Sequence, residues 1–205
     1  MWPLLCIIAA LALCIYLPYY NAHPFSGREW AVLVEGGSGI MRLRTVDDPT
    51  DSAELRRPSR ELSRREIRSK DMKLLMRRML ATVQNPENEG VGIAAPQVGI
   101  SRRLIAVQRF DKEGAPFEFY PNIYITWQSP ETALGGEGCL SVPGRYGRVR
   151  RSASIDIKYL DPESCRPVTE HVEGFTAVIF QHEVDHLDGV LYIDKLEEAD
   201  FADNR

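Results

Sequence analysis

Apolar residues recur along residues 24–205 with two spacings, one typical of helices and one of short strands. After Ser63, which forms a capping-box pattern with Glu66, Met, Leu and Val recur at helical spacing until Asn85-Pro86. A second helix is expected from Glu173 to Leu187, with Gly189 as its C-cap. Short β-rich runs predict strands at Ala31–Val34, Leu104–Val107, Glu118–Ile125 and Ser154–Leu160. This order predicts an α+β fold in which the last helix packs against antiparallel strands.

The first 22 residues differ from the rest. From Leu4 to Leu17 every side chain is apolar or aromatic, and the first charged residue is Arg28. A helix of this length spans about 21 Å, which is shorter than a hydrocarbon core of about 30 Å. The length suits an export signal and makes a marginal membrane anchor possible. A buried N-terminal helix and a start codon placed too early are the alternatives.

These patterns divide the chain into three parts. We expect an export signal or membrane anchor over residues 1–22, and a linker with a short strand over residues 23–45. The folded domain would cover residues 46–205, with a polar surface loop at 44–60.

Composition narrows the class of protein. The chain has 205 residues, 44% of them hydrophobic and 26% charged, which excludes a coiled coil and a wholly disordered protein. Four cysteines are too few for a disulfide-built scaffold. The net charge of -4 gives no reason to expect a nucleic-acid partner. The basic stretch 42–78, the acidic stretch 182–205 and four arginines are interpreted as solvated surface; the arginines are Arg145, Arg148, Arg150 and Arg151.

The second helix carries a metal-site pattern. His182-Glu183-Val184-Asp185-His186 contains H-E-x-x-H, which places the two histidines one turn apart on one helix face. Two imidazoles can then share a divalent cation, and Glu183 can reach a water on that cation. Two histidines satisfied by hydrogen bonds, with Glu183 facing water, are the alternative.

A third ligand decides the class of metal site. The metzincin pattern would place a third histidine at position 192, but Tyr192 stands there. In other zincins a later acidic residue serves, and Glu197 and Glu198 are available, although no second helix is evident to carry them.

Two further segments complete a resemblance. Gly90–Gln97 is rich in small residues, and Glu137–Ser141 contains Cys139. Together with Gln181–Leu187 they resemble the three signatures of the peptide deformylase family, G-x-G-x-A-A-x-Q, E-G-C-L-S and Q-H-E-x-D-H-L, in the family's order. The resemblance covers Leu55 to Tyr192 and leaves out the apolar N-terminus. It implies an α+β fold with antiparallel sheets packed around a central metal-binding α-helix, preceded here by an extra apolar segment.

The resemblance also implies roles for individual residues. Metal ligands would be Cys139, His182 and His186, holding one divalent ion, usually Fe²⁺ in the family, with Zn²⁺ or Ni²⁺ as alternatives. The general acid/base would be Glu183, and the oxyanion would be bound by the side-chain amide of Gln97 and the backbone N–H of Leu140. Residues that hold the substrate backbone would be Val91, Gly92 and Gly138.

The implied reaction is hydrolysis of the N-formyl group from formyl-methionyl peptides in protein biosynthesis, with release of formate. We expect a monomeric bacterial hydrolase that is membrane-anchored or exported through residues 1–20, or cytoplasmic if the start site is misplaced. A zincin-type endopeptidase and a non-catalytic binding module that retains the family's motifs are the alternatives. The endopeptidase would need a third ligand outside Glu137–Ser141.

Overall fold

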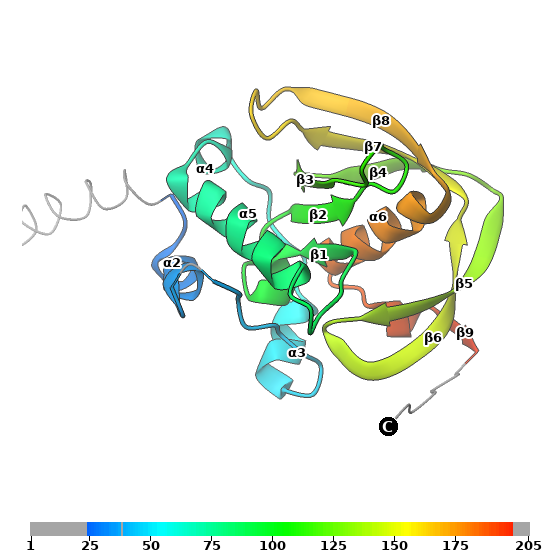
Figure 1. The fold of residues 1–205 in the computed structure, drawn as a ribbon, viewed down its shortest axis with the longest axis horizontal. Coiled ribbons are helices and arrows are strands. Elements are labelled where there is room, and N and C mark those ends of the chain that lie inside the picture. The colour runs from blue at the N-terminus through cyan, green and yellow to red at the C-terminus, as the bar shows by residue number, and fades with distance from the viewer. Residues whose placement is uncertain (1–23, 38, 199–205) are drawn as a thin grey trace, which may run out of the picture.

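Three antiparallel sheets of three strands each form the framework of the molecule (Figure 1). The computed structural model describes residues 24–37 and 39–198. One sheet has the order β1-β2-β3, with strands Gly92–Ala94, Leu104–Gln108 and Phe117–Pro121. A second has the order β4-β7-β8, with strands Tyr124–Gln128, Ser154–Leu160 and Pro167–Glu173. The third has the order β5-β6-β9, with strands Thr132–Cys139, Val142–Ser152 and Leu196–Glu198. The predicted α+β class with antiparallel strands is confirmed.

Helix α6 (Gly174–Leu187) contacts strands from all three sheets. Its run Phe175–Phe180 is rich in apolar residues, and Ala177, Phe180, Val184 and Leu187 are buried in the core between the first two sheets. A helix that is apolar on several sides is buried rather than amphipathic. Residues on α6 are therefore held by neighbours on most sides.

A separate group of helices covers the other face of the first sheet (Figure 1). Helix α5 (Lys70–Val83) presents Met72, Leu75, Met79 and Val83 to Ile93, Leu104 and Ala106. The predicted long helix is two helices, α4 (Arg64–Ile67) and α5, because Ser69 caps a second N-terminus by accepting from the Met72 N–H. A short 3₁₀ helix, η2 (Tyr192–Asp194), leads into β9.

Three other expectations about elements were wrong. The predicted loop 44–60 contains helix α3 (Pro49–Leu55), which begins at an Asp48 N-cap with Pro49 in its first turn. The predicted strand Glu118–Ile125 is two strands of different sheets, since Asn122 turns the chain at a φ of +52°. Four strands were not expected at all; they are β1, β5, β6 and β9.

A further expectation was wrong in the N-terminal part of the described chain. The predicted strand Ala31–Val34 lies in helix α2 (Gly27–Val34), so the linker assigned to residues 23–45 contains a helix instead. Ser26 and Glu29 form a capping box at its start. Leu33 is fully buried on the side that faces α5. Tertiary packing and the cap outweigh the β preference of Val32 and Val34.

Two buried arginines hold α2 on the domain. Arg102 has no exposed surface and pairs with Glu29 of α2, at 2.8 Å from Nη2 to Oε2, and with Glu66 of α4. Arg78 of α5 donates to the carbonyl oxygens of Leu33, Glu35, Gly39 and Ile40 at 2.6–3.0 Å. Carbonyls at the end of a helix lack partners within the helix, so these bonds complete α2.

The export signal or membrane anchor expected over residues 1–22 lies outside the described residues. Within residues 24–37 and 39–198, no helix is long and apolar enough to cross a membrane.

The pairing of Glu29 predicts acid-dependent stability. Burial alone would raise the pKa of Glu29, but the hydrogen bonds from Arg102 and Ser26 lower it from 4.5 to about 2. Because the folded pKa lies below the unfolded one, this contribution is complete above pH 4.5 and is lost as the pH falls toward 2. We expect Glu29→Gln to lower the free energy of unfolding by about 3 kcal/mol at pH 7 and by much less near pH 2, measured by urea unfolding. An equal loss at both pH values would contradict this account.

Candidate active site

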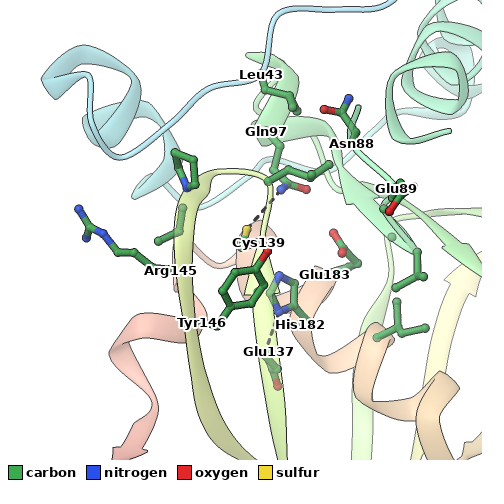
Figure 2. A pocket seen from close by; sticks show the side chains of 18 of the residues that line it. Leu43, Asn88, Glu89, Gln97, Glu137, Cys139, Arg145, Tyr146, His182 and Glu183 are labelled. Carbon is green, nitrogen blue, oxygen red and sulfur yellow. Dashed lines mark hydrogen bonds and ion pairs between the residues drawn. The ribbon is translucent and has the colours of Figure 1, made fainter. Parts of the chain in front are cut away.

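Three potential metal ligands meet where β5 ends beside α6, and Figure 2 shows two of them, Cys139 and His182. His182 and His186 lie one turn apart on α6, and Cys139 is the last residue of β5. One ligand atom from each of these residues lies within 4.8 Å of the others. The Cys139 Sγ is 3.2 Å from the His186 Nε2. The structure therefore brings together the three residues that the sequence predicts as a set.

A buried carboxylate orients His182. Glu137 Oε2 is 2.8 Å from the His182 Nδ1, which leaves the Nε2 of that ring available to a metal. Arg151 of β6 donates two hydrogen bonds to the same carboxylate, from Nε at 2.7 Å and from Nη2 at 2.9 Å. Arg151 also pairs with Asp185 of α6. These bonds outweigh burial and lower the pKa of Glu137 to about 2, so the carboxylate stays ionised.

The groups around the two histidines favour a single positive charge on the pair, carried by His182. Burial alone would lower the pKa of His182, but hydrogen bonds with Cys139 and Glu137 raise it to about 10. Burial and the neighbouring His182 instead hold the pKa of His186 well below 6.5. The pair of rings thus carries one positive charge beside Cys139 and the ionised Glu137, and a divalent ion bound there would take the place of the proton on His182.

Glu183 is enclosed at the same place. Its side chain is almost fully buried, and its Oε2 has no hydrogen-bond partner among the described residues. Burial raises the pKa of Glu183 to about 7. Gly92 of β1 lies directly against it, because a Cβ on Gly92 would stand 2.5 Å from the Glu183 Oε1. A carboxyl group with a pKa near neutrality can both accept and return a proton.

The amide of Gln97 is fixed in one orientation. Gln97 lies in the 3₁₀ helix η1 (Ala95–Val98), and its Oε1 accepts from the Ala94 N–H at 2.8 Å. Its Nε2 therefore points toward the Cys139 Sγ at 3.6 Å and the Ser141 Oγ at 3.3 Å (Figure 2). A donor fixed in this way can stabilise negative charge without rearranging.

A cleft of about 510 Å³ joins these groups. Every residue predicted as catalytic or substrate-binding lines it; these are Gln97, Leu140, Glu183, Val91, Gly92 and Gly138. Cys139 and His182 also line the cleft, whereas His186 lies beneath them with 1% of its surface exposed. Tyr146 lies over Gly138, since a Cβ there would meet the Tyr146 ring at 2.7 Å.

The donor set fits a transition metal. It offers one thiol and two imidazoles, which suit Fe²⁺, Zn²⁺ or Ni²⁺ better than Mg²⁺, which prefers oxygen ligands. The orphaned Oε2 of Glu183 also indicates a polar partner that the protein alone does not supply. Glu197, the acidic third ligand of the zincin alternative, does not join this set, because its carboxylate pairs with Arg150 on the surface.

Comparison with known proteins agrees with this geometry. The family model described as "Polypeptide deformylase" matches residues 40–202. The chain belongs to the polypeptide deformylase family. A peptide deformylase from Leptospira biflexa is 42% identical over 167 residues, covering 78% of this chain and 89% of the relative. One from Natranaerobius thermophilus is 40% identical over 160 residues, covering 78% and 94%.

Solved structures of the family share the fold. A class I type b peptide deformylase from Acinetobacter baumannii has a TM-score of 0.70 and 36% identity, covering 78% of this chain and 100% of that one. A peptide deformylase from Thermotoga maritima has a TM-score of 0.67 and 35% identity, covering 78% and 99%. Deformylases are metalloenzymes that remove the N-formyl group from nascent peptides. Helix α2 lies before the residues that the family model matches.

The interpretation of Arg151 as solvated surface was wrong. Its side chain is only 4% exposed and holds Glu137. Along β6 the side chains of Val149 and Arg151 point the same way, so the strand's period of two could have placed Arg151 in the interior. No role for Glu137 was inferred either, because its partner Arg151 lies 14 residues away along the chain.

The contact between Gly92 and Glu183 gives a test of the site. We expect Gly92→Ala to reduce kcat/KM for a formyl-methionyl peptide at least about a hundredfold, because the new Cβ would stand 2.5 Å from the Glu183 Oε1 and displace this carboxylate from its present position. Steady-state formate release would measure the loss. The control is Gly135→Ala in β5, where a Cβ meets nothing within 4 Å. Full activity of Gly92→Ala would show that Glu183 does not need its present position.

Proposed function

We propose that this chain hydrolyses the N-formyl group of formyl-methionyl peptides, with release of formate and a free amine. The observation that carries the proposal is the convergence, in one cleft, of the Cys139–His182–His186 set, the buried Glu183 and the fixed amide of Gln97. Amide hydrolysis needs an activated water, a proton shuttle and a stabiliser of the oxyanion, and these groups can supply all three.

Cys139, His182 and His186 would hold the metal. A divalent ion bound there lowers the pKa of a water from about 16 to about 7 and so makes it a nucleophile near neutral pH. Fe²⁺ is our first choice from the family resemblance, with Zn²⁺ and Ni²⁺ as alternatives. Cys139 would supply a thiolate and the two histidines neutral imidazoles, and three protein ligands of these kinds are typical of metal sites that activate a water.

Two free sheet edges would hold the substrate. β1 and β5 are both at an edge of their sheets, and both contribute residues to the cleft. A peptide lying between them in extended form can pair its backbone with Val91 and Gly92 on one side and Gly138 on the other. The absence of side chains at the two glycines lets the peptide come close. A peptide deformylase from Acinetobacter baumannii with a TM-score of 0.68 binds the tripeptide Met-Ala-Ser, which supports a peptide ligand here.

Proton transfer would fall to Glu183. It accepts a proton from the attacking water and returns it to the departing nitrogen. Negative charge on the formyl oxygen would be stabilised by the Gln97 amide and the Leu140 N–H; loss of one such donor typically costs about 10²–10³ in rate. Glu137 and Arg151 would keep His182 in place throughout the cycle.

The export or anchoring role of residues 1–22 is a proposal from the sequence, together with a bacterial source and a monomeric state. It is supported by the apolar run Leu4–Leu17. The intact mass of the purified protein would distinguish an anchor from a cleaved signal. Residues 1–22 would still be present if they are an anchor and would be missing if they are a cleaved signal.

Replacement of Glu183 tests the proposed chemistry. Glu183→Gln should lower kcat for formate release from a formyl-methionyl tripeptide by about 10²–10⁴, because the amide cannot carry the proton. Metal content, measured on the same protein prepared without oxygen, should not change, because Glu183 is not a proposed ligand. The matched control is Glu163→Gln in the exposed β7–β8 turn, which should behave as wild type. Near-full activity of Glu183→Gln would overturn its assigned role.

A further inference from the structure

A strongly basic surface lies on the helices that cover the first sheet. We call it the basic face, and its residues are all exposed; they are Arg57, Arg60, Arg64, Arg68, Lys70, Lys73 and Arg77. Within residues 57–77, Glu61 is the only exposed carboxylate, because Glu66 and Asp71 are buried. The overall charge of the chain is -4, so this concentration of positive charge is local.

Most of these cations are not neutralised. Lys70, Lys73 and Arg77 share one side of α5, since residues three and four apart are neighbours on a helix. Among the residues that the structure describes, no carboxylate pairs with these three, or with Arg57, Arg64 and Arg68. Unpaired cations held on rigid helices give a fixed positive potential that attracts anions.

The chain enters the domain at this same face. Phe25 is buried, with its ring 5.1 Å from the guanidinium carbon of Arg102, which pairs with Glu66 of α4. Just after Phe25, a cavity of about 210 Å³ is lined by three arginines together with Ser26, Glu29 and Glu54; the arginines are Arg28, Arg57 and Arg60. Both carboxylates are already paired, Glu54 with Arg28 and Glu29 with Arg102. Arg57 therefore offers an unpaired guanidinium at this cavity.

The sequence before Phe25 indicates what covers the face. The uncharged apolar run ends at Leu17, and seven residues separate it from Phe25. Seven residues reach at most about 25 Å, whereas a domain of this size is about 40 Å across. If the apolar run enters a bilayer, the face around Phe25 must turn toward the membrane surface. We propose that the basic face docks on the anionic phospholipid headgroups of a membrane.

This orientation leaves the catalytic cleft open. Lys70 and Lys73 of the basic face lie in the first turns of α5, whereas the cleft is lined by Glu87–Gly92, which follow the other end of this helix (Figure 1). Fourteen residues of α-helix are about 21 Å long. A membrane-bound enzyme would thus keep its substrate entrance away from the headgroups.

The test is cosedimentation of the full chain with two kinds of vesicle, phosphatidylcholine alone and phosphatidylcholine mixed with phosphatidylglycerol. The apolar N-terminus would bind both, so the difference between them isolates the basic face. We expect tighter binding to the anionic vesicles, weakened by salt. The double variant Lys70→Gln/Lys73→Gln should lose about thirtyfold in affinity for anionic vesicles and nothing for neutral ones.

The matched control removes two exposed lysines elsewhere, in Lys112→Gln/Lys158→Gln, so that net charge changes equally. This control should bind anionic vesicles nearly as wild type does. Formate release should be unchanged in both variants, which verifies folding. Equal binding of wild type to both vesicles, or equal losses in the two variants, would overturn the proposal. Preference for an RNA duplex over anionic vesicles at the same salt would assign the face to nucleic acid instead and overturn it as well.

Discussion

The geometry of the site depends on one buried carboxylate. Glu137 of β5 is held by Arg151 of β6 and in turn holds the His182 ring of α6, so it joins a sheet to a helix at the point where the ligands meet. Burying a lone carboxylate costs several kcal/mol, and a bidentate arginine with full hydrogen bonding offsets that cost. Removal of either partner would leave a charge buried without compensation. The position of His182 relative to Cys139 follows from this arrangement.

The chemistry of the cleft follows from how little its groups can move. α6 is enclosed by strands of all three sheets, Glu183 is buried against Gly92, and the Gln97 amide is tied to the Ala94 N–H. Groups held in this way stabilise a developing charge without reorganising. The flexible partner is the substrate, which can lie between the free edges of β1 and β5.

How far the sequence predicts the molecule depends on the range of each interaction. His182 and His186 could be paired from their spacing alone, because the helical repeat is local. Cys139 joins them only through the family resemblance, since 42 residues of chain separate it from His182. Arg151 was misread because its partner lies on a neighbouring strand. Asn122 and Ser69 divided two expected elements, and each did so through a single turn or cap that composition does not reveal.

The central claim is that Cys139, His182 and His186 bind one metal ion. The most direct test is the absorption spectrum of the protein loaded with Co²⁺ without oxygen, compared between wild type and Cys139→Ser. A thiolate ligand produces a sulfur-to-cobalt charge-transfer band, so wild type should show this band at one Co²⁺ per chain and Cys139→Ser should lack it. A band of unchanged intensity in Cys139→Ser would mean that Cys139 is not a ligand, and the account of the site would be wrong.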